Sequence, residues 1–217
     1  MTNRLLSCLA TLAGMAAATA VTAGPLYFDA AIHKLSPPAG VTFSAIGGDV
    51  GYDVREGIDF IGVTLPGGNV EIDDGQTLIL NFATPQIFSD LTLGLLFDDE
   101  FSDDFEAAGV LADGSSFQFI LAVTSATTAT WNGPGATVAN ISPAAPLGGG
   151  VWSITTPFAD LPVSELRFTS APGITNNSSG DYGLVRFTSH SVPEAGATLV
   201  LLGTALAAMW SAARRKR

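Results

Sequence analysis

Between residues 24 and 191, short stretches of the sequence alternate apolar and polar side chains with a period of two. This alternation places every second side chain on one face of an extended strand, so that one face can pack while the other meets solvent. No stretch of the region has the sustained period of 3.6 residues that a packed helix shows. The clearest alternating stretches are Leu78–Phe82, Phe117–Thr124, Trp152–Thr155, Glu165–Thr169 and Val185–Thr188, and further candidates are Val41–Ile46, Ile58–Leu65 and Leu91–Phe97.

Residues typical of turns separate these stretches. About eight to ten short strands joined by such turns predict an all-β fold, an antiparallel β-sandwich that is jelly-roll-like. Residues 124–150 are rich in Thr, Ala, Gly and Pro, and a long loop and an irregular edge remain alternatives there. The turn signals include Pro66-Gly67-Gly68-Asn69, Asp73-Asp74-Gly75, Asp113-Gly114 and Asn132-Gly133-Pro134-Gly135.

The first 23 residues have the three-part layout of a secretory signal peptide. Arg4 supplies a positive charge, an apolar stretch follows from Leu5 to Val21, and small residues end the segment at Ala23. A segment of this kind directs export and is removed by signal peptidase. We therefore expect residues 1–23 to be a leader and residues 24–191 to be one exported domain. A permanent N-terminal membrane anchor is the alternative.

The last 26 residues, 192–217, combine a short polar motif, an apolar stretch and a basic end. Residues 195–213 carry no charge, and as a helix they would be ~28 Å long, close to the ~30 Å hydrocarbon thickness of a bilayer. A cluster of cations after such a helix stays on the cytoplasmic side. We expect a transmembrane helix at 195–213 in the inner membrane with the domain outside. The basic tail is Arg214, Arg215, Lys216 and Arg217.

This order of parts resembles the PEP-CTERM sorting signal of Gram-negative bacteria. The motif is Val192-Pro193-Glu194-Ala195, and Ala195 stands where the family usually has Pro. The resemblance implies that an exosortase, a membrane-embedded transpeptidase-like enzyme, recognises the motif and removes the helix. The protein would then pass from the membrane to the cell surface or the medium. A second segment, Gly57–Phe82, is similar to a segment of exported proteins with this signal, whose domains are presumed β-sandwiches.

The predicted domain is strongly acidic. Its four basic residues and nineteen acidic residues give a net charge of −15. A surface of this charge repels nucleic acid and anionic lipid, so we expect no nucleic-acid partner. The one cysteine, Cys8, belongs to the predicted leader, so the domain folds without disulfides.

The densest group of carboxylates follows the predicted strand Leu91–Phe97. Oxygen ligands at close spacing are what Ca²⁺ requires, so one hypothesis is a calcium site there. The alternative is a solvated acidic loop, because a run of charges alone specifies no coordination geometry. A smaller acidic group comprises Glu71, Asp73 and Asp74. The candidate calcium ligands are Asp98, Asp99, Glu100, Asp103 and Asp104.

The sequence contains no assembled catalytic motif. His33 and His190 have no metal-binding spacing, and no G-x-S-x-G segment occurs. We therefore expect a protein that is not an enzyme. Trp131 and Trp152 are candidates for an aromatic surface that contacts a glycan, and core packing is the alternative for both.

Taken together, these patterns predict an exported structural or adhesive protein that is associated with extracellular polysaccharide. A carbohydrate-binding module, with or without calcium, is the first alternative, and a glycoside hydrolase with two facing carboxylates is the second.

Overall fold

The computed structural model describes residues 24–97, 107–114, 117–142, 149–171, 181–192 and 203. The described strands belong to one compact unit, Ala23–Val192. The predicted leader lies outside the described residues, and so does the sorting signal apart from Val192 and Gly203. Within the described residues, no helix is both long enough and apolar enough to cross a membrane.

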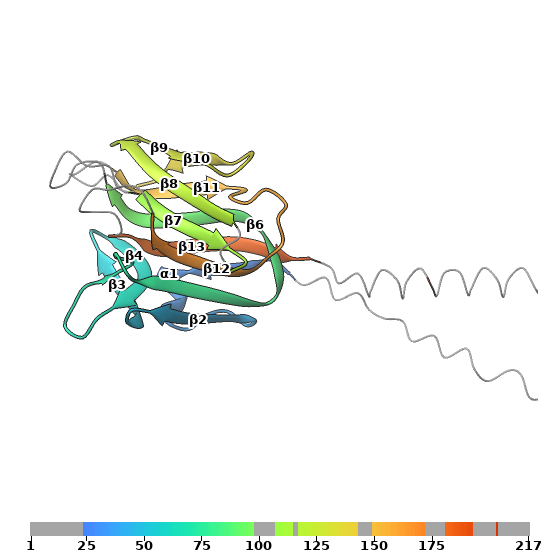
Figure 1. The fold of residues 1–217 in the computed structure, drawn as a ribbon, viewed down its shortest axis with the longest axis horizontal. Helices are drawn as coiled ribbons and strands as arrows, with labels where there is room; N and C mark the ends of the chain where they lie inside the picture. The colour runs from blue at the N-terminus through green and yellow to red at the C-terminus, as the bar shows by residue number, and fades with distance from the viewer. Residues whose placement is uncertain are drawn as a thin grey trace, which may run out of the picture. The chain divides into compact units, whose positions relative to one another are not determined.

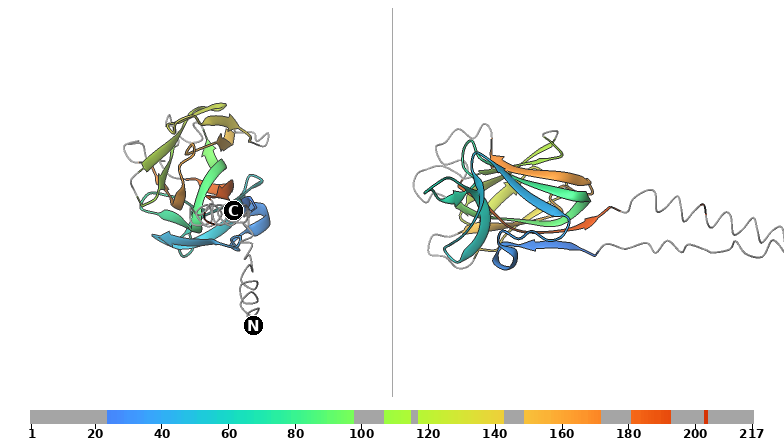
Figure 2. Two further views of the ribbon diagram at one scale, coloured as in Figure 1. Left: turned by 90° about the vertical axis from the view of Figure 1, so that its right-hand side faces the viewer. Right: turned by 90° about the horizontal axis from the view of Figure 1, so that it is seen from below.

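The body is all-β and antiparallel between its named strands, and it fits a β-sandwich (Figures 1 and 2). One short helix, α1 (Ala30–His33), interrupts the strands and is capped at its N-terminus by Asp29, whose side chain accepts a hydrogen bond from the Ala31 N–H. The strands are β1 (Leu26–Asp29), β2 (Val41–Ile46), β3 (Asp49–Arg55), β4 (Ile58–Thr64), β5 (Val70–Glu71), β6 (Thr77–Phe97), β7 (Ala107–Ala112), β8 (Phe117–Ser125), β9 (Thr128–Trp131), β10 (Thr137–Asn140), β11 (Gly149–Thr155), β12 (Val163–Ser170) and β13 (Gly183–Ser191).

The long strand β6 belongs to both layers of the body. Its first half pairs with β2 and β12, and its second half pairs with β13 and β11. The strand bends between the halves (Figure 1), and the stretch that joins them contains Pro85, a residue that cannot donate to a ladder. In Figure 1 it runs along one side, turns at the end from which β13 leaves, and returns. A bent strand of this kind links two packed sheets through a corner.

The last strand, β13, lies in the interior of its sheet. One side of it pairs with β6. The other side pairs with β1 over Arg186–Ser189 and with β4 at Leu184. The strand order is β3-β4-β13-β6-β12-β7-β8-β9 along the main path. The first and last strands of the body are therefore neighbours.

The inward-facing residues of both layers form one large core. Leu78, Leu80 and Phe82 from β6 join Phe168 from β12 and Phe187 from β13 in this cluster. A smaller cluster of Ile58, Phe60, Leu95, Phe97 and Val151 is also buried. Burial of this apolar surface is the main force that holds the two layers together.

The alternating stretches of the sequence are strands in the structure, with two differences. Leu78–Phe82 and Leu91–Phe97 were expected as separate strands, but both belong to β6, because the residues between them continue in the ladder around the bend. Residues 124–150, for which a long loop and an irregular edge were the alternatives, contain the short strands β9 and β10. The strand β3, which carries one glycine and three charged residues, had no clear alternation.

Candidate functional site

The clearest candidate site is a hollow beside a break in the sheet. Because β13 pairs with β6 on one side, its partners β1 and β4 must share the other side. β1 ends at Asp29, opposite Arg186, and β4 is paired at Ile61, opposite Leu184. The register of β13 also shifts between Leu184 and Arg186. The backbone neighbours of β13 therefore change at Val185, and a hollow opens there, which we call the break hollow.

The break hollow has an apolar floor. It encloses about 200 Å³, and its lining consists of Asp29, Ala31, Gly57, Ile58, Asp59, Ile141, Val151 and Val185. Ile58 and Val151 are buried, whereas Ile141 is 42% exposed. Gly94 of β6 makes this floor possible, since a Cβ there would lie 2.7 Å from Val185 Cγ2 and 3.1 Å from Ile58 Cγ2. The absence of a side chain lets Ile58 and Val185 pack over β6.

Two aspartates line the hollow, and a tyrosine holds each of them. The Tyr27 hydroxyl donates to Asp29 Oδ2 at 2.7 Å, and Asp29 Oδ1 accepts from the Ala31 N–H at 2.9 Å. The Tyr52 hydroxyl donates to Asp59 Oδ1. Asp59 Oδ2 accepts no hydrogen bond from the described residues. Both side chains are therefore oriented, and one oxygen of Asp59 is free to accept a bond from a ligand.

The tyrosine hydroxyls remain proton donors at neutral pH. The hydrogen bond to Asp29 raises the pKa of Tyr27, and burial adds to the effect. The hydrogen bond to Asp59 raises the pKa of Tyr52 in the same way. A carboxylate favours the protonated form of a phenol that donates to it, because the ionised phenol would repel it. The negative charge of the hollow therefore stays on the two aspartates.

Neither aspartate has an ion-pair partner among the described residues. The nearest cations have other contacts. Arg186 lies 3.7 Å from Asp90 Oδ1 and donates from Nε to Thr92 Oγ1 at 3.2 Å. The Lys34 ammonium lies 5.3 Å from the centre of the Tyr52 ring. The hollow thus presents two carboxylates that form no ion pair with a described cation, above an apolar floor.

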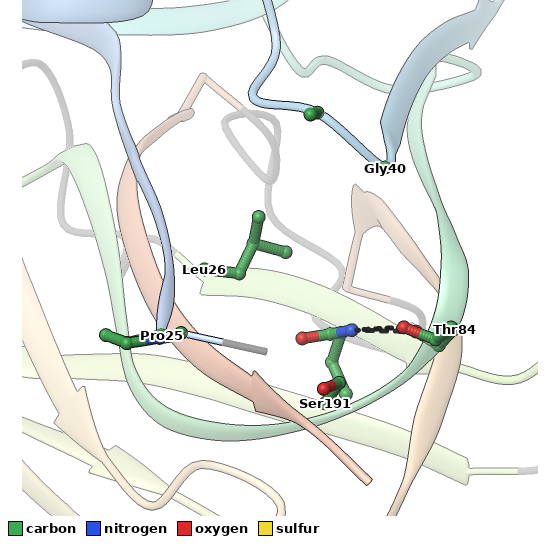
Figure 3. Close-up of a pocket in the computed structure, with 8 residues that line it drawn as sticks. Pro25, Leu26, Gly40, Thr84 and Ser191 are labelled. Atoms are coloured by element: carbon green, nitrogen blue, oxygen red, sulfur yellow. Dashed lines mark hydrogen bonds between the residues drawn. The ribbon is translucent and has the colours of Figure 1, made fainter. Parts of the chain in front are cut away.

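A second hollow, of about 170 Å³, lies where the body begins and ends (Figure 3). Gly24, Pro25 and Leu26 line one part of it, and Ser191 lines another. The buried Gln86 side chain completes the lining, and its amide is fully used within the protein. Nε2 donates to Thr84 O and Thr84 Oγ1, and Oε1 accepts from the Ser189 hydroxyl. These hydrogen bonds stabilise the bend of β6, so the polar side chains here have a structural role.

The two tryptophans proposed for glycan contact, Trp131 and Trp152, differ in burial. Trp152 is 1% exposed, and its Nε1 donates to the Leu96 carbonyl at 2.8 Å. With no exposed ring face, Trp152 cannot contact a glycan. Trp131 stacks on Phe119 with ring centres 5.7 Å apart and donates from Nε1 to the Pro157 carbonyl. The packing role that the sequence left as the alternative therefore describes Trp152, whereas Trp131 is half-buried and its contact with a glycan stays a prediction.

The candidate calcium ligands Asp98, Asp99, Glu100, Asp103 and Asp104 lie outside the described residues. The calcium site there stays a prediction. Within the described part of the chain, no three acidic, histidine or cysteine side chains converge as a metal site. Glu71, from the smaller acidic group, forms an ion pair with Arg55.

Of the predicted sorting motif, the structure describes Val192 only, whose N–H donates to the Pro85 carbonyl at 3.0 Å. Pro193, Glu194 and Ala195 lie outside the described residues, and so does the basic tail Arg214, Arg215, Lys216 and Arg217.

No family model matches the chain, and a search of the curated proteins finds no match.

The break hollow could not be predicted from the sequence. Asp29 and Asp59 are thirty positions apart and belong to no shared motif. They line the same hollow because β1 and β4 pair with the same side of β13. Such a pairing of distant strands cannot be recognised from local sequence patterns. The one local sign was a tyrosine two residues before Asp29, a spacing that places both side chains on the same face of a strand.

Proposed function

We propose that this chain is an exported surface or extracellular-matrix protein of a Gram-negative bacterium, sorted by an exosortase and associated with exopolysaccharide. Residues 1–23 are its leader, and residues 192–217 are its PEP-CTERM-like sorting signal, with the transmembrane helix at 195–213. The body is a jelly-roll-like β-sandwich with a structural or adhesive role. Signal peptidase and exosortase are its processing partners, and the inner membrane holds it until processing.

The position of the two ends of the body supports this proposal. β1 and β13 pair antiparallel, with Leu26 opposite Ser189. The start of β1 and the end of β13 therefore lie together, and Gly24 and Ser191 line the same hollow. The compact unit ends at Val192, the first residue of the motif. A folded body of this kind leaves both proposed processing sites at one end, next to the membrane that carries the enzymes.

The experiment that tests sorting compares the native protein with a Pro193→Ala/Glu194→Ala variant in the native host. Intact mass and cell fractionation are measured for both. We expect the wild-type protein to lose about its last 25 residues, because the helix is the part that the proposed enzyme removes, and the variant to keep them and remain in the membrane. A full-length, membrane-bound product from both chains would contradict sorting and make the tail a plain anchor.

A carbohydrate-binding role is the second candidate, and the break hollow favours it. The hollow combines an apolar floor with hydrogen-bond acceptors at its edge, the two features that a sugar ring requires. Hydrolysis is less well supported, because both oxygens of Asp29 are already bonded to Tyr27 and Ala31. A catalytic carboxyl group must be able to exchange a proton or attack the sugar, which these bonds oppose.

A further inference from the structure

The charge of the break hollow restricts the ligands that it can bind. Asp29 and Asp59 line it without a cation, and the body as a whole has a net charge of −15. Arg186 and Lys34 are occupied by Asp90, Thr92 and the Tyr52 ring. An anionic ligand would be repelled here, and a cation would meet two oriented carboxylates. The charge therefore favours a ligand that carries a positive group.

The floor restricts the ligand further. Ile58, Val151 and Val185 offer aliphatic carbon at the base, and Ile141 extends this surface toward solvent. A pyranose ring presents C–H groups on its face and polar groups at its rim, so it can cover such a floor while the rim reaches the carboxylates. The volume of about 200 Å³ is below the ~300 Å³ at which pockets for whole small ligands begin. One residue of a longer chain is therefore the fitting occupant.

A basic peptide fits this position less well. Peptides that bind sheets usually add a strand at an edge, where backbone groups are free to pair. The strands beneath the hollow already pair with one another on the sheet face, β13 with β6 and β6 with β11. A peptide backbone lying over this floor would lose its hydrogen bonds to water without replacement.

From these observations we propose that the break hollow binds a polysaccharide with protonated amino groups, such as a chain of unacetylated hexosamine. The free Oδ2 of Asp59 accepts a hydrogen bond from the ammonium group, and Asp29 adds a second negative charge. The aliphatic floor contacts the ring. This inference rests on the proposed association with polysaccharide and names the chemical class that the association requires.

The test uses the full chain, purified with its membrane segment in a polyoxyethylene detergent that carries no sugar. Two probes with the same backbone are compared by titration calorimetry in mildly acid buffer of low salt. One is a glucosamine oligosaccharide and the other is its N-acetylated counterpart. We expect the glucosamine chain to bind at least about tenfold more tightly, because a charge-assisted bond to a carboxylate is lost on acetylation.

Matched variants separate the hollow from the general charge of the body. Asp29→Asn/Asp59→Asn removes two negative charges in the hollow, and Asn retains the ability to cap α1. The control, Asp49→Asn/Asp160→Asn, removes two negative charges at exposed positions. Neither of these side chains forms a hydrogen bond among the described residues. We expect the first pair to weaken binding about tenfold and the second to change it less than about twofold. Ile141→Ser should weaken binding without any change of charge.

Each contrary result has a distinct meaning. Equal effects of the two double variants would overturn the inference, since general charge would then explain binding. Equal binding of the two sugars would overturn the role of the amine while leaving polysaccharide association in place. Oligolysine could instead bind more tightly than the glucosamine chain and lose this binding in the Asp29→Asn/Asp59→Asn variant. The ligand would then be a basic peptide and not a sugar. Binding of no saccharide would contradict the association itself, whereas sorting is decided separately by the intact mass.

Discussion

Among single side chains, Tyr182 contributes a buried hydrogen-bond donor to the core. Its ring is fully buried, and its hydroxyl lies 3.0 Å from Gly109 O and 2.9 Å from Thr169 O. Burial raises the pKa of Tyr182 well above its ordinary value, because the ionised phenol would have no water around it. The side chain therefore joins the residue just before β13 to β7 and β12, through one hydroxyl proton shared between two carbonyls.

We expect Tyr182→Phe to lower the free energy of unfolding by about 1–3 kcal/mol, because two buried carbonyls lose their donor. Chemical denaturation measures this change. The control is Tyr27→Phe, which removes an exposed hydroxyl and should alter stability by less than about 0.5 kcal/mol. Equal effects of the two substitutions would show that the buried hydroxyl contributes no more to the free energy of unfolding than an exposed one.

Asp181 makes the stability of the body depend on pH. Partial loss of hydration raises the pKa of this carboxyl. The negative charge of Asp73 raises the pKa further, and the positive charge of Arg55 partly opposes the shift. A raised pKa means that the fold favours the protonated form. The stability from this group is present below about pH 4, the unfolded pKa, and is lost as the pH rises through the folded value.

We therefore expect Asp181→Asn to raise the melting temperature at neutral pH, because the uncharged amide removes the repulsion from Asp73. The gain should shrink as the pH is lowered toward about 4, where the native carboxyl is protonated as well. Thermal unfolding of both proteins across this range measures the difference. A gain that is independent of pH would contradict the electrostatic cause.

The strands differ in how well the sequence predicted them. β2 and β4 were expected nearly to the residue, because alternation and flanking glycines define them. β6 was not expected as one strand, because clear alternation occurs only in two separate stretches, Leu78–Phe82 and Leu91–Phe97. The bend is stabilised by distant residues, with Val192 bonded to the Pro85 carbonyl and Gln86 bonded to Ser189. Contacts of that separation leave no local pattern.

β13 is the strand on which the body most depends. We expect a chain that ends at Asp181 to lack cooperative unfolding and to be cleaved rapidly by protease, because β6, β4 and β1 would each lose a partner. The core would also lose Leu184 and Phe187. A chain that ends at Val192 should unfold cooperatively. Cooperative unfolding of the shorter chain would show that β13 is dispensable.

For the molecule as a whole, the class of fold could be predicted and the candidate site could not. Alternation and turns report whether residues are strand or loop, and they predicted an antiparallel all-β body. The break hollow arises because β1 and β4, distant in sequence, share one side of β13. The role of Trp152 could not be chosen from the sequence for a related reason. Aromatic residues favour both cores and binding surfaces, and only the burial of Trp152 distinguishes the two.

The pairing of β1 with β13 also affects when the body can fold. The first strand finds its neighbour only after nearly the whole domain has been made, and pairings of such long sequence separation form slowly. If the chain is exported as proposed, this delay would help it to cross the membrane unfolded, because the domain could not close before its last strand had emerged.

The same pairing determines how the protein would carry mechanical force. If the chain is held at its C-terminus while the break hollow grips a polymer, tension enters through β13. This strand is flanked by β6 on one side and by β1 and β4 on the other. A pull along its axis loads these hydrogen bonds together in shear, instead of opening them one after another. The last strand, β13, would thus transmit the force between the C-terminal attachment and the bound polymer.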